Sequence, residues 1–353
     1  MSNRGLYTEL ADIISLRGGH VPVVKNDEFY SLVEELFTEV EAELAVKMPL
    51  DYFRLTDFVE NSRTSDVKLI EDHLETMVDK GLMIVQKRDT GKYYKLPPLV
   101  PGIMELQAFK DEVNDRSKKI ARLLINYYNS LKKVADSHMS REGPRSASAR
   151  LISVERRFPE GLKVLSYEEA LEYANASEQV TAGICLDRHL GALLERPCAK
   201  PKEVCMGLSR DAKAIADRGF VKLISKDEAR SLLDLSEEAG LIHLTIIEPG
   251  KTEVEFICNC CICHCRVLKG LKFSPVPSQA VISKFILKID YAACNGCGMC
   301  IDRCVMTALK LDNGNLVHDL DRCVGCGLCR YVCPVDAMKL ELKGMTSAGL
   351  SSQ

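Results

Sequence analysis

Two copies of one cysteine pattern lie near the end of this 353-residue chain. The run CNGCGMCIDRCVMTALKL, at 294–311, aligns without a gap with CVGCGLCRYVCPVDAMKL, at 323–340. Each copy reads Cys-x2-Cys-x2-Cys-x3-Cys, and all sixteen cysteines of the chain fall between Cys185 and Cys333. Cysteines bunched at such short spacings in an intracellular chain bind metal more often than they form disulfides. We therefore expect the later part of the chain to fold around metal and the cysteine-free front part around ordinary hydrophobic cores.

The spacing within each copy is the signature with which bacterial ferredoxins bind two [4Fe-4S] clusters. A tight loop points three thiolates at one cluster, and the fourth cysteine, on the following helical turn, faces the other cluster. Structural zinc sites also use Cys-x2-Cys pairs, but three cysteines at this spacing followed by a fourth, in tandem, favour clusters. We expect one cluster on Cys294, Cys297, Cys300 and Cys333, and its partner on Cys323, Cys326, Cys329 and Cys304.

Glycines in both loops suit a backbone that wraps closely around a cluster. Glycine tolerates unusual backbone angles and lets amide N–H groups approach the sulfides. The four glycines are Gly296, Gly298, Gly325 and Gly327. Pro334 follows the second copy, as the pattern expects, whereas Val305 takes that place in the first copy and removes no ligand.

Eight further cysteines precede the repeat, and five of them lie within the run CNCCICHC at 258–265. Core packing does not account for five thiols in eight residues. We expect the group to bind metal, as one or two further clusters or as a structural zinc site, with a redox-active thiol pair as the remaining alternative. The group comprises Cys185, Cys198, Cys205, Cys258, Cys260, Cys261, Cys263 and Cys265.

Histidines and arginines accompany this second cysteine group. His189 and His264 are candidate ligands, although a single histidine is more often structural. Arg188 and Arg266 are either cationic neighbours that offset thiolate charge or solvated surface residues. The sequence leaves both pairs of alternatives open.

The first hundred residues predict a winged helix. Apolar residues at helical spacing predict a helix over 27–47, then a short helix from Thr56 and a longer one from Ser65 to Gly81. The segments LMIVQK and YYKL predict two strands around a turn at 88–91. Helices followed by a hairpin in this order are typical of that module.

The charge of the candidate recognition helix argues against DNA as its partner. The helix carries five acidic residues against two lysines, so it would repel the phosphate backbone. The predicted wing carries Lys87, Arg88, Lys92 and Lys95, which keeps DNA binding as an alternative. We expect the module to dock on a protein or to pair with a second copy in a homodimer.

The segments that follow mix helices and strands. An amphipathic helix is predicted over about 105–137, followed by a polar linker at 140–150. LISVE and KVL predict strands, and Ser166 with Glu169 predicts a capping box before a helix over 167–176. A second helix is predicted over 226–240, with a strand after it at LIHLTII.

The order of these features resembles a family of ferredoxin-like proteins of anaerobes that are described as 4Fe-4S-binding. The shared features are LPPLVPGIMELQ after the winged helix, Cys185…Cys198…Cys205-Met206, GLIHL, CNCCICHC and the tandem ferredoxin runs. The resemblance covers nearly the whole chain and implies electron transfer. The resemblance implies Cys-x-Cys-Arg where this chain reads Cys185-Leu186-Asp187-Arg188. Either Asp187 is an oxygen ligand in place of the second cysteine, or that ligand is missing here.

Together these patterns predict an α+β multidomain protein. The predicted parts are a winged-helix domain at 1–104, a helical connector and linker at 105–150, a mixed α/β cysteine-rich middle domain at 151–283, a two-cluster ferredoxin domain at 284–342 and a flexible tail at 343–353.

Composition narrows the function without naming a substrate. A net charge of −3 gives no reason to expect nucleic acid or an anionic membrane as the main partner. The sequence shows neither a bilayer-spanning stretch nor a secretion signal, so we expect a cytoplasmic protein. Nucleotide-binding fingerprints are absent too. We expect an electron carrier that relays low-potential electrons to a partner oxidoreductase, rather than a stand-alone enzyme; a redox-enzyme subunit with a reactive middle cluster, or a redox-sensing DNA-binding regulator, is the alternative.

Overall fold

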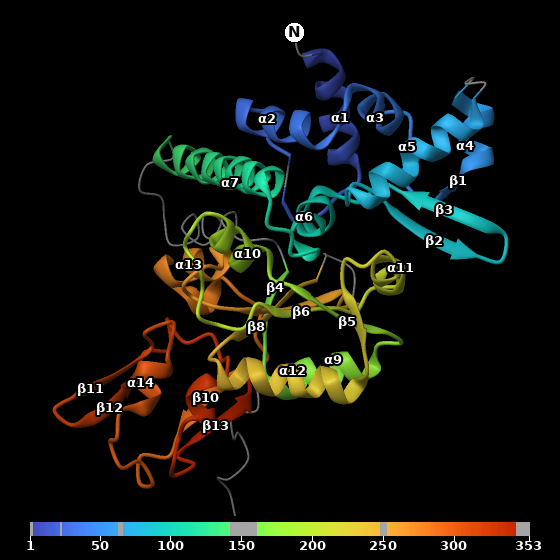
Figure 1. The fold of residues 1–353 in the computed structure, drawn as a ribbon. Helices are drawn as coiled ribbons and strands as arrows, with labels where there is room; N and C mark the ends of the chain where they lie inside the picture. The colour runs from blue at the N-terminus through green and yellow to red at the C-terminus, as the bar shows by residue number, and fades with distance from the viewer. Residues whose placement is uncertain (1–2, 22, 63–65, 142–160, 248–252, 344–353) are drawn as a thin grey trace, which may run out of the picture. The chain divides into compact units, whose positions relative to one another are not determined.

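The computed structural model describes residues 3–21, 23–62, 66–141, 161–247 and 253–343 as two compact units (Figure 1). The first unit combines 1–143 with 181–197 and 210–223, and the second combines 144–180, 198–209 and 224–353. Each unit is described by itself below. The domain boundaries expected from the sequence stay a prediction. The expected linker at 140–150 begins inside α7 (Asp115–Arg141), and its remainder and the strand LISVE lie outside the described residues.

Helices dominate the front of the first unit. They are α1 (Arg4–Leu16), α2 (Asp27–Leu36), α3 (Glu39–Ala45), α4 (Leu55–Ser62) and α5 (Val67–Asp79). The single helix expected over 27–47 is wrong, because the chain breaks at Phe37 and starts again with a capping box between Thr38 and Glu41. Helix α5 is capped by Asp66, while Ser65, the expected cap, lies outside the described residues.

Three short strands complete the front of this unit. The predicted hairpin is present as β2 (Ile84–Arg88) and β3 (Gly91–Lys95), and β1 (Phe53–Arg54) pairs with β3 to give the order β1-β3-β2. Tyr94 on β3 is fully buried and its hydroxyl donates to the Glu75 carboxylate of α5 at 2.6 Å. The sheet is thereby fixed against α5.

The single helix expected over about 105–137 is wrong, because the structure has two helices separated by a break. The segment Leu99–Ile103, whose backbone is not helical at Val100, Pro101 and Gly102, leads into α6 (Met104–Phe109), and α7 (Asp115–Arg141) follows after a break. The break coincides with Asp111 in the left-handed region, at φ 54°, and with a reciprocal cap between Asn114 and Ser117. The main hydrophobic core runs from α1 to α7 and takes in Leu186 and Leu190 of α10 (Leu186–Leu193).

The later segments of the first unit are short. Helix α11 (Ala212–Asp217) lies in 210–223, where Arg218 pairs with Glu75 and, at 3.3 Å, with Asp79 of α5. Strands β5 (Val180–Ile184) and β7 (Lys222–Ile224) lie where the chain passes from one unit to the other.

The second unit contains four neighbouring antiparallel strands with helices on both faces. The strands are β4 (Leu162–Leu165), β8 (Ile242–Ile246), β9 (Phe256–Cys260) and β6 (Glu203–Gly207), in that order. Helices α9 (Tyr167–Ala176) and α12 (Lys226–Glu238) lie together over the face that carries Met206 and Ile257 (Figure 1). Helix α13 (Arg266–Phe273) packs on the opposite face through Leu268 and Leu271. The predicted capping box of Ser166 and Glu169 is confirmed.

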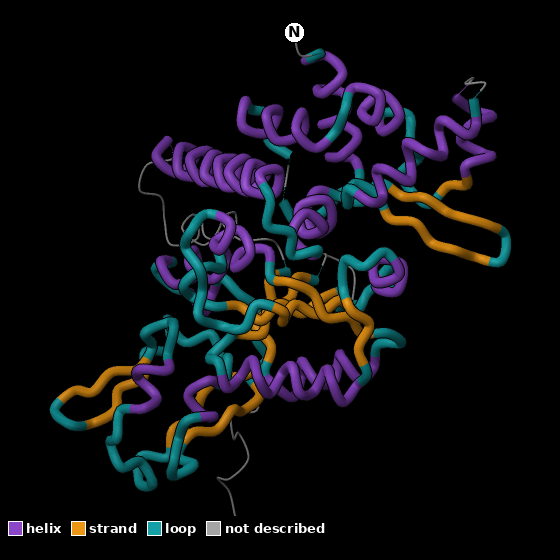
Figure 2. The backbone as a smooth tube through the Cα atoms, viewed as in Figure 1, coloured by secondary structure: helices purple, strands orange, loops and turns teal. Residues whose placement is uncertain are grey.

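The end of the second unit is mostly loop, with two short two-stranded sheets (Figure 2). Strand β10 (Phe285–Ile289) pairs with β13 (Met338–Leu342), and β11 (Leu309–Asp312) pairs with β12 (Asn315–His318). Helices α14 (Met299–Arg303) and α15 (Leu328–Tyr331) each follow a cysteine loop. A turn of 3-10 helix at Pro277–Gln279 precedes this region. Arg322 donates to the Lys272 carbonyl of α13 at 2.8 Å, which fastens the region to the rest of the unit.

Candidate metal centres

The two cysteine loops have the same backbone. Gly296 and Gly325 have φ of 69° and 67°, and Gly298 and Gly327, which precede α14 and α15, have φ of 78° and 81°. Residues with side chains rarely adopt these left-handed angles, so glycine is favoured at all four positions. At Gly325 a side chain would also meet the Phe285 carbonyl oxygen at 2.2 Å. The loops therefore wrap closely, as cluster-binding loops do.

Strands from the two copies pair with each other, and this pairing brings the fourth cysteine of each copy toward the loop of the other copy. Strand β10 precedes the first loop but pairs with β13, which follows the second loop. Strand β11, which follows the first loop, pairs with β12, which precedes the second. The Cys304 and Cys333 positions, just before β11 and β13, are consequently carried toward the loop of the other copy.

The thiols of the ferredoxin region lie close enough to influence one another. Burial raises the pKa of Cys300, and the nearby charges of Cys294, Cys297 and Cys333 raise it further. Burial likewise raises the pKa of Cys329, together with Cys326, Cys323, Cys304 and Cys300. Metal-free thiols in these places would hold their protons at neutral pH, and a bound cation would reverse that preference.

One pocket contains the whole second set. Its lining includes Cys304, Cys323, Cys326 and Cys329, together with Gly325 and Gly327. The backbone N–H of Ala308 donates to the Cys304 sulfur at 3.3 Å, a hydrogen bond of the kind that stabilises a thiolate ligand. Burial raises the pKa of Cys326 to about 12. The residues present thus fit a buried cubane, which would supply one-electron redox chemistry at this place.

The two predicted cluster sites differ in exposure. Cys297 in the first loop is exposed, and so are Tyr291 and Met299 beside it. The corresponding second loop is buried, with Val324 and Leu328 each 2% exposed. The first site therefore opens to solvent and the second faces the interior of the unit.

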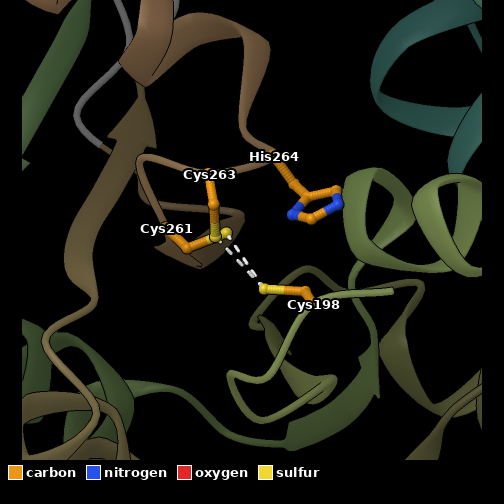
Figure 3. A group of neighbouring side chains, drawn as sticks. All are labelled: Cys198, Cys261, Cys263 and His264. Carbon is orange, nitrogen blue, oxygen red and sulfur yellow. Dashed lines mark hydrogen bonds between the residues drawn. The ribbon is translucent and has the colours of Figure 1, made fainter. Parts of the chain in front are cut away.

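The eight cysteines of the second group do not form one site. The turn after β9 carries Cys261, Cys263 and His264, and these gather with Cys198, so that their ligand atoms lie within 4.8 Å of one another (Figure 3). The Cys198 sulfur lies 3.9 Å from that of Cys261 and 3.2 Å from that of Cys263. Burial raises the pKa of Cys263 to about 12, aided by hydrogen bonds with Cys198 and Cys261.

A second subset lies on the face of the sheet that looks toward the ferredoxin region. Cys258 and Cys260 alternate with the buried Asn259 on β9, so both point to the same face. They share a hydrophobic core with Cys265, and Cys304 and Cys326 of the ferredoxin region pack against that core. Extending the β6–β9 register by one residue places Cys205 opposite Cys258.

Cys185 and its neighbours lie in the first unit. Cys185 caps α10 and is 8% exposed, and Arg188 on that helix is 1% exposed. His189 lies 2.9 Å from the Asp111 carboxylate. His189 is thus engaged with a carboxylate, and the structure places Cys185, Asp187 and Arg188 on a helix that packs into the first unit's core.

His264 is a candidate ligand from its sequence position, but it is not one of the eight middle cysteines that the sequence predicts as metal ligands. Its adjacency to Cys263 was the signal that could have included it, because a turn that points one side chain at a metal brings its neighbour close. The contact with Cys198, far away in the sequence, leaves no local trace.

Comparison with known proteins supports the ferredoxin interpretation. Residues 316–339 match the model of the 4Fe-4S binding domain. No curated protein matches the chain. In the part of the chain that the structure describes, no helix has the length and apolarity needed to cross a bilayer. The C-terminal region is therefore a 4Fe-4S-binding, ferredoxin-like domain, with a cysteine-rich region before it that could bind metal.

Proposed function

We propose that this protein transfers single electrons at low potential through two [4Fe-4S] clusters to a partner redox protein. The observation that carries the proposal is the duplicated loop, whose fourth cysteine crosses to the other copy and completes a pocket lined by four thiols. When bound, a cubane supplies the one-electron chemistry. The chain's own residues hold it, bury it and donate amide hydrogen bonds to its ligands.

The difference in exposure gives the relay a direction. A partner would contact the first cluster, because Cys297 is exposed, and so are the large side chains of Tyr291 and Met299, which are near it in the sequence. The second cluster, on Cys304, Cys323, Cys326 and Cys329, would take the electron inward. Beyond it the core formed with Cys260 and Cys265 offers the next metal site, an additional Fe-S or metal centre of the middle region.

Burial favours the relay over the enzyme-subunit alternative. A reactive cluster needs an iron that a substrate can reach. Cys260 and Cys265 are 7% and 5% exposed, and they pack among Leu268 and Leu271 of α13. A centre on these thiols would be closed, which suits electron passage.

The N-terminal part fits a winged helix that docks on a protein or on a second copy of the chain. Two of the four basic residues of the expected wing pair with carboxylates within the molecule. Lys92 lies 3.0 Å from Glu71 and 2.8 Å from Glu75, and Lys95 lies 3.9 Å from Asp211. Phosphate binding would have to break these pairs, so a DNA-binding regulator is not favoured.

The proposal is tested on protein purified without oxygen. We expect about eight iron and eight sulfide for the two ferredoxin clusters, and about twelve of each if the middle region holds a third. Titration with a low-potential reductant should give reversible one-electron steps followed by electron paramagnetic resonance. Ferredoxin sites that contain zinc, or clusters that show no reversible reduction, would overturn it.

A further inference from the structure

We propose that Cys198, Cys261, Cys263 and His264 bind a single zinc ion, separate from the ferredoxin clusters, and that this zinc fastens the segment 198–209 to the turn after β9. The four side chains come from two segments that are far apart in the sequence. They converge on one point, with all four ligand atoms within 4.8 Å of one another (Figure 3).

The spacing of the sulfurs favours one ion over a cubane. With zinc–sulfur bonds of about 2.3 Å, two thiolates of a tetrahedral site lie about 3.8 Å apart. The sulfur of Cys198 is 3.9 Å from that of Cys261 and 3.2 Å from that of Cys263. A cubane binds its four thiolates at four separate corners and holds them further apart.

The ferredoxin thiols of the same chain provide an internal comparison. Cys300 and Cys329 sense their neighbouring thiols as charges, and no sulfur–sulfur hydrogen bond joins the described ferredoxin cysteines. Cys198 does form such contacts, with Cys261 and Cys263, and Cys260 forms them with Cys258 and Cys265. The ferredoxin thiols are therefore spaced openly and both groups of middle cysteines are compact, but only the group around Cys198 adds a histidine as a fourth ligand.

The donor set matches zinc. Three thiolates and one imidazole form a closed four-ligand shell of the kind found in structural zinc sites, with no ligand position left for a substrate. Cys261 is 2% exposed while Cys263 is exposed, so the shell is anchored on one side and accessible to an entering ion on the other. Each cysteine would release its proton to solvent as the ion binds.

The local fold indicates which part of the chain a metal would stabilise. The segment 198–209 belongs to the second unit, but the residues before and after it, 197 and 210, belong to the first unit. Around Cys198 it is held by a small core of Val204, Leu241 and Cys261, and by Lys200, which donates to the Ala239 carbonyl at 2.6 Å. Cys198 precedes β6, so a metal that joins it to the 261–264 turn would stabilise the start of the segment, which the pairing of β6 with β9 does not include.

The turn itself is shaped to present the ligands. The Cys265 N–H donates to the Cys261 carbonyl at 3.1 Å and closes the turn over 261–265. Strand β9 ends at Cys260, so the residues of the turn are released from the alternation of the strand. That change of direction separates Cys261 and Cys263 from Cys258 and Cys260.

The first test uses the unmodified full chain. Protein produced with excess iron and purified without oxygen should contain about one zinc per chain. X-ray absorption at the zinc edge should show three sulfurs at about 2.3 Å and one nitrogen at about 2.0 Å. A shell of four sulfurs would place zinc on other cysteines, and iron in place of zinc would mean a cluster; either result overturns the proposal.

Substitutions assign the ligands. Cys198→Ser should lower zinc at least tenfold while leaving the iron of the ferredoxin clusters unchanged, and His264→Ala should do the same. His264→Cys should retain zinc and convert its shell to four sulfurs. Cys185→Ser, which changes a buried cysteine of the first unit, is the control and should retain zinc. Zinc that survives Cys198→Ser with its shell intact would overturn the proposal.

The outcome is separate from that of the electron-transfer proposal. Zinc with the expected shell in a protein that shows no reversible reduction would overturn only the relay. Clusters that reduce reversibly in a protein without zinc would overturn only the zinc site.

Discussion

Cys304 and Cys326 come from different copies of the repeat, yet both line one pocket of the ferredoxin region. The strands explain it, since β11 begins a few residues after Cys304 and pairs with β12, just before the second loop. Each copy is therefore incomplete without the other. Each predicted cluster therefore takes its fourth ligand from the other copy, while the two ligand sets share no cysteine.

The crossed arrangement predicts how paired substitutions behave. Cys304→Ser with Cys323→Ser removes two ligands from one predicted cluster, so about four iron per chain should remain. Cys304→Ser with Cys294→Ser removes one ligand from each cluster and should damage both. Iron analysis and electron paramagnetic resonance of the reduced proteins distinguish the pairs. The reverse result would mean that each copy binds its own cluster.

Two equivalent glycines should tolerate alanine differently. Both Gly296 and Gly325 have positive φ, so alanine costs about 1–2 kcal/mol of backbone strain at either. At Gly325 the new Cβ would also meet the Phe285 carbonyl oxygen at 2.2 Å, whereas at Gly296 the nearest atom is 3.6 Å away. Gly325→Ala should therefore lose iron to a chelator several-fold faster than Gly296→Ala. Equal rates would show that the close approach of β10 does not constrain the loop.

The ferredoxin region could be predicted because its information is local. Three cysteines, two glycines and a fourth cysteine recur at fixed spacing, and the loops and short helices follow that spacing. The helices α9 and α12 were also predictable, since Ser166 and Ser225 begin them with capping boxes. The break between α2 and α3 was missed because apolar positions continue at helical spacing across Thr38, whose cap with Glu41 interrupts the helix.

The sequence alone does not show which of the middle cysteines belong to the same site. A dense run of thiols hides the point at which β9 ends at Cys260 and the turn begins. The partner of Cys263 is Cys198, and only the folded chain brings them to 3.2 Å. The position of the segment 210–223 is likewise not predictable from local sequence, because Arg218 pairs with Glu75 of α5, which lies far earlier in the chain.

That ion pair predicts a stability difference in the first unit. Burial raises the pKa of Glu75, but hydrogen bonds from Lys92, Tyr94 and Arg218 outweigh it and lower the pKa to about 2. Arg218→Ala should destabilise the unit by about 1–2 kcal/mol, because Arg218 and Glu75 are both largely shielded from solvent. Lys213→Ala removes the exposed pair with Asp217 and should change little. Chemical denaturation followed by circular dichroism measures both, and similar losses would contradict the expectation.

Glu237 predicts how stability depends on pH. Burial, with a contribution from the nearby Glu168 carboxylate, raises its pKa to about 7. The folded protein therefore binds a proton that the unfolded chain, with a carboxyl pKa of about 4.3, has released, so stability falls as the pH rises from about 4.3 to about 7. Glu237→Gln removes this loss and should stabilise the protein by about 1 kcal/mol at pH 8, with a smaller difference near pH 5.5. The exposed Glu238→Gln is the control, and thermal unfolding under argon across this range is the measurement. A gain from Glu237→Gln that does not change with pH would show that the carboxyl is already ionised throughout, and that the burial of its charge costs the fold nothing.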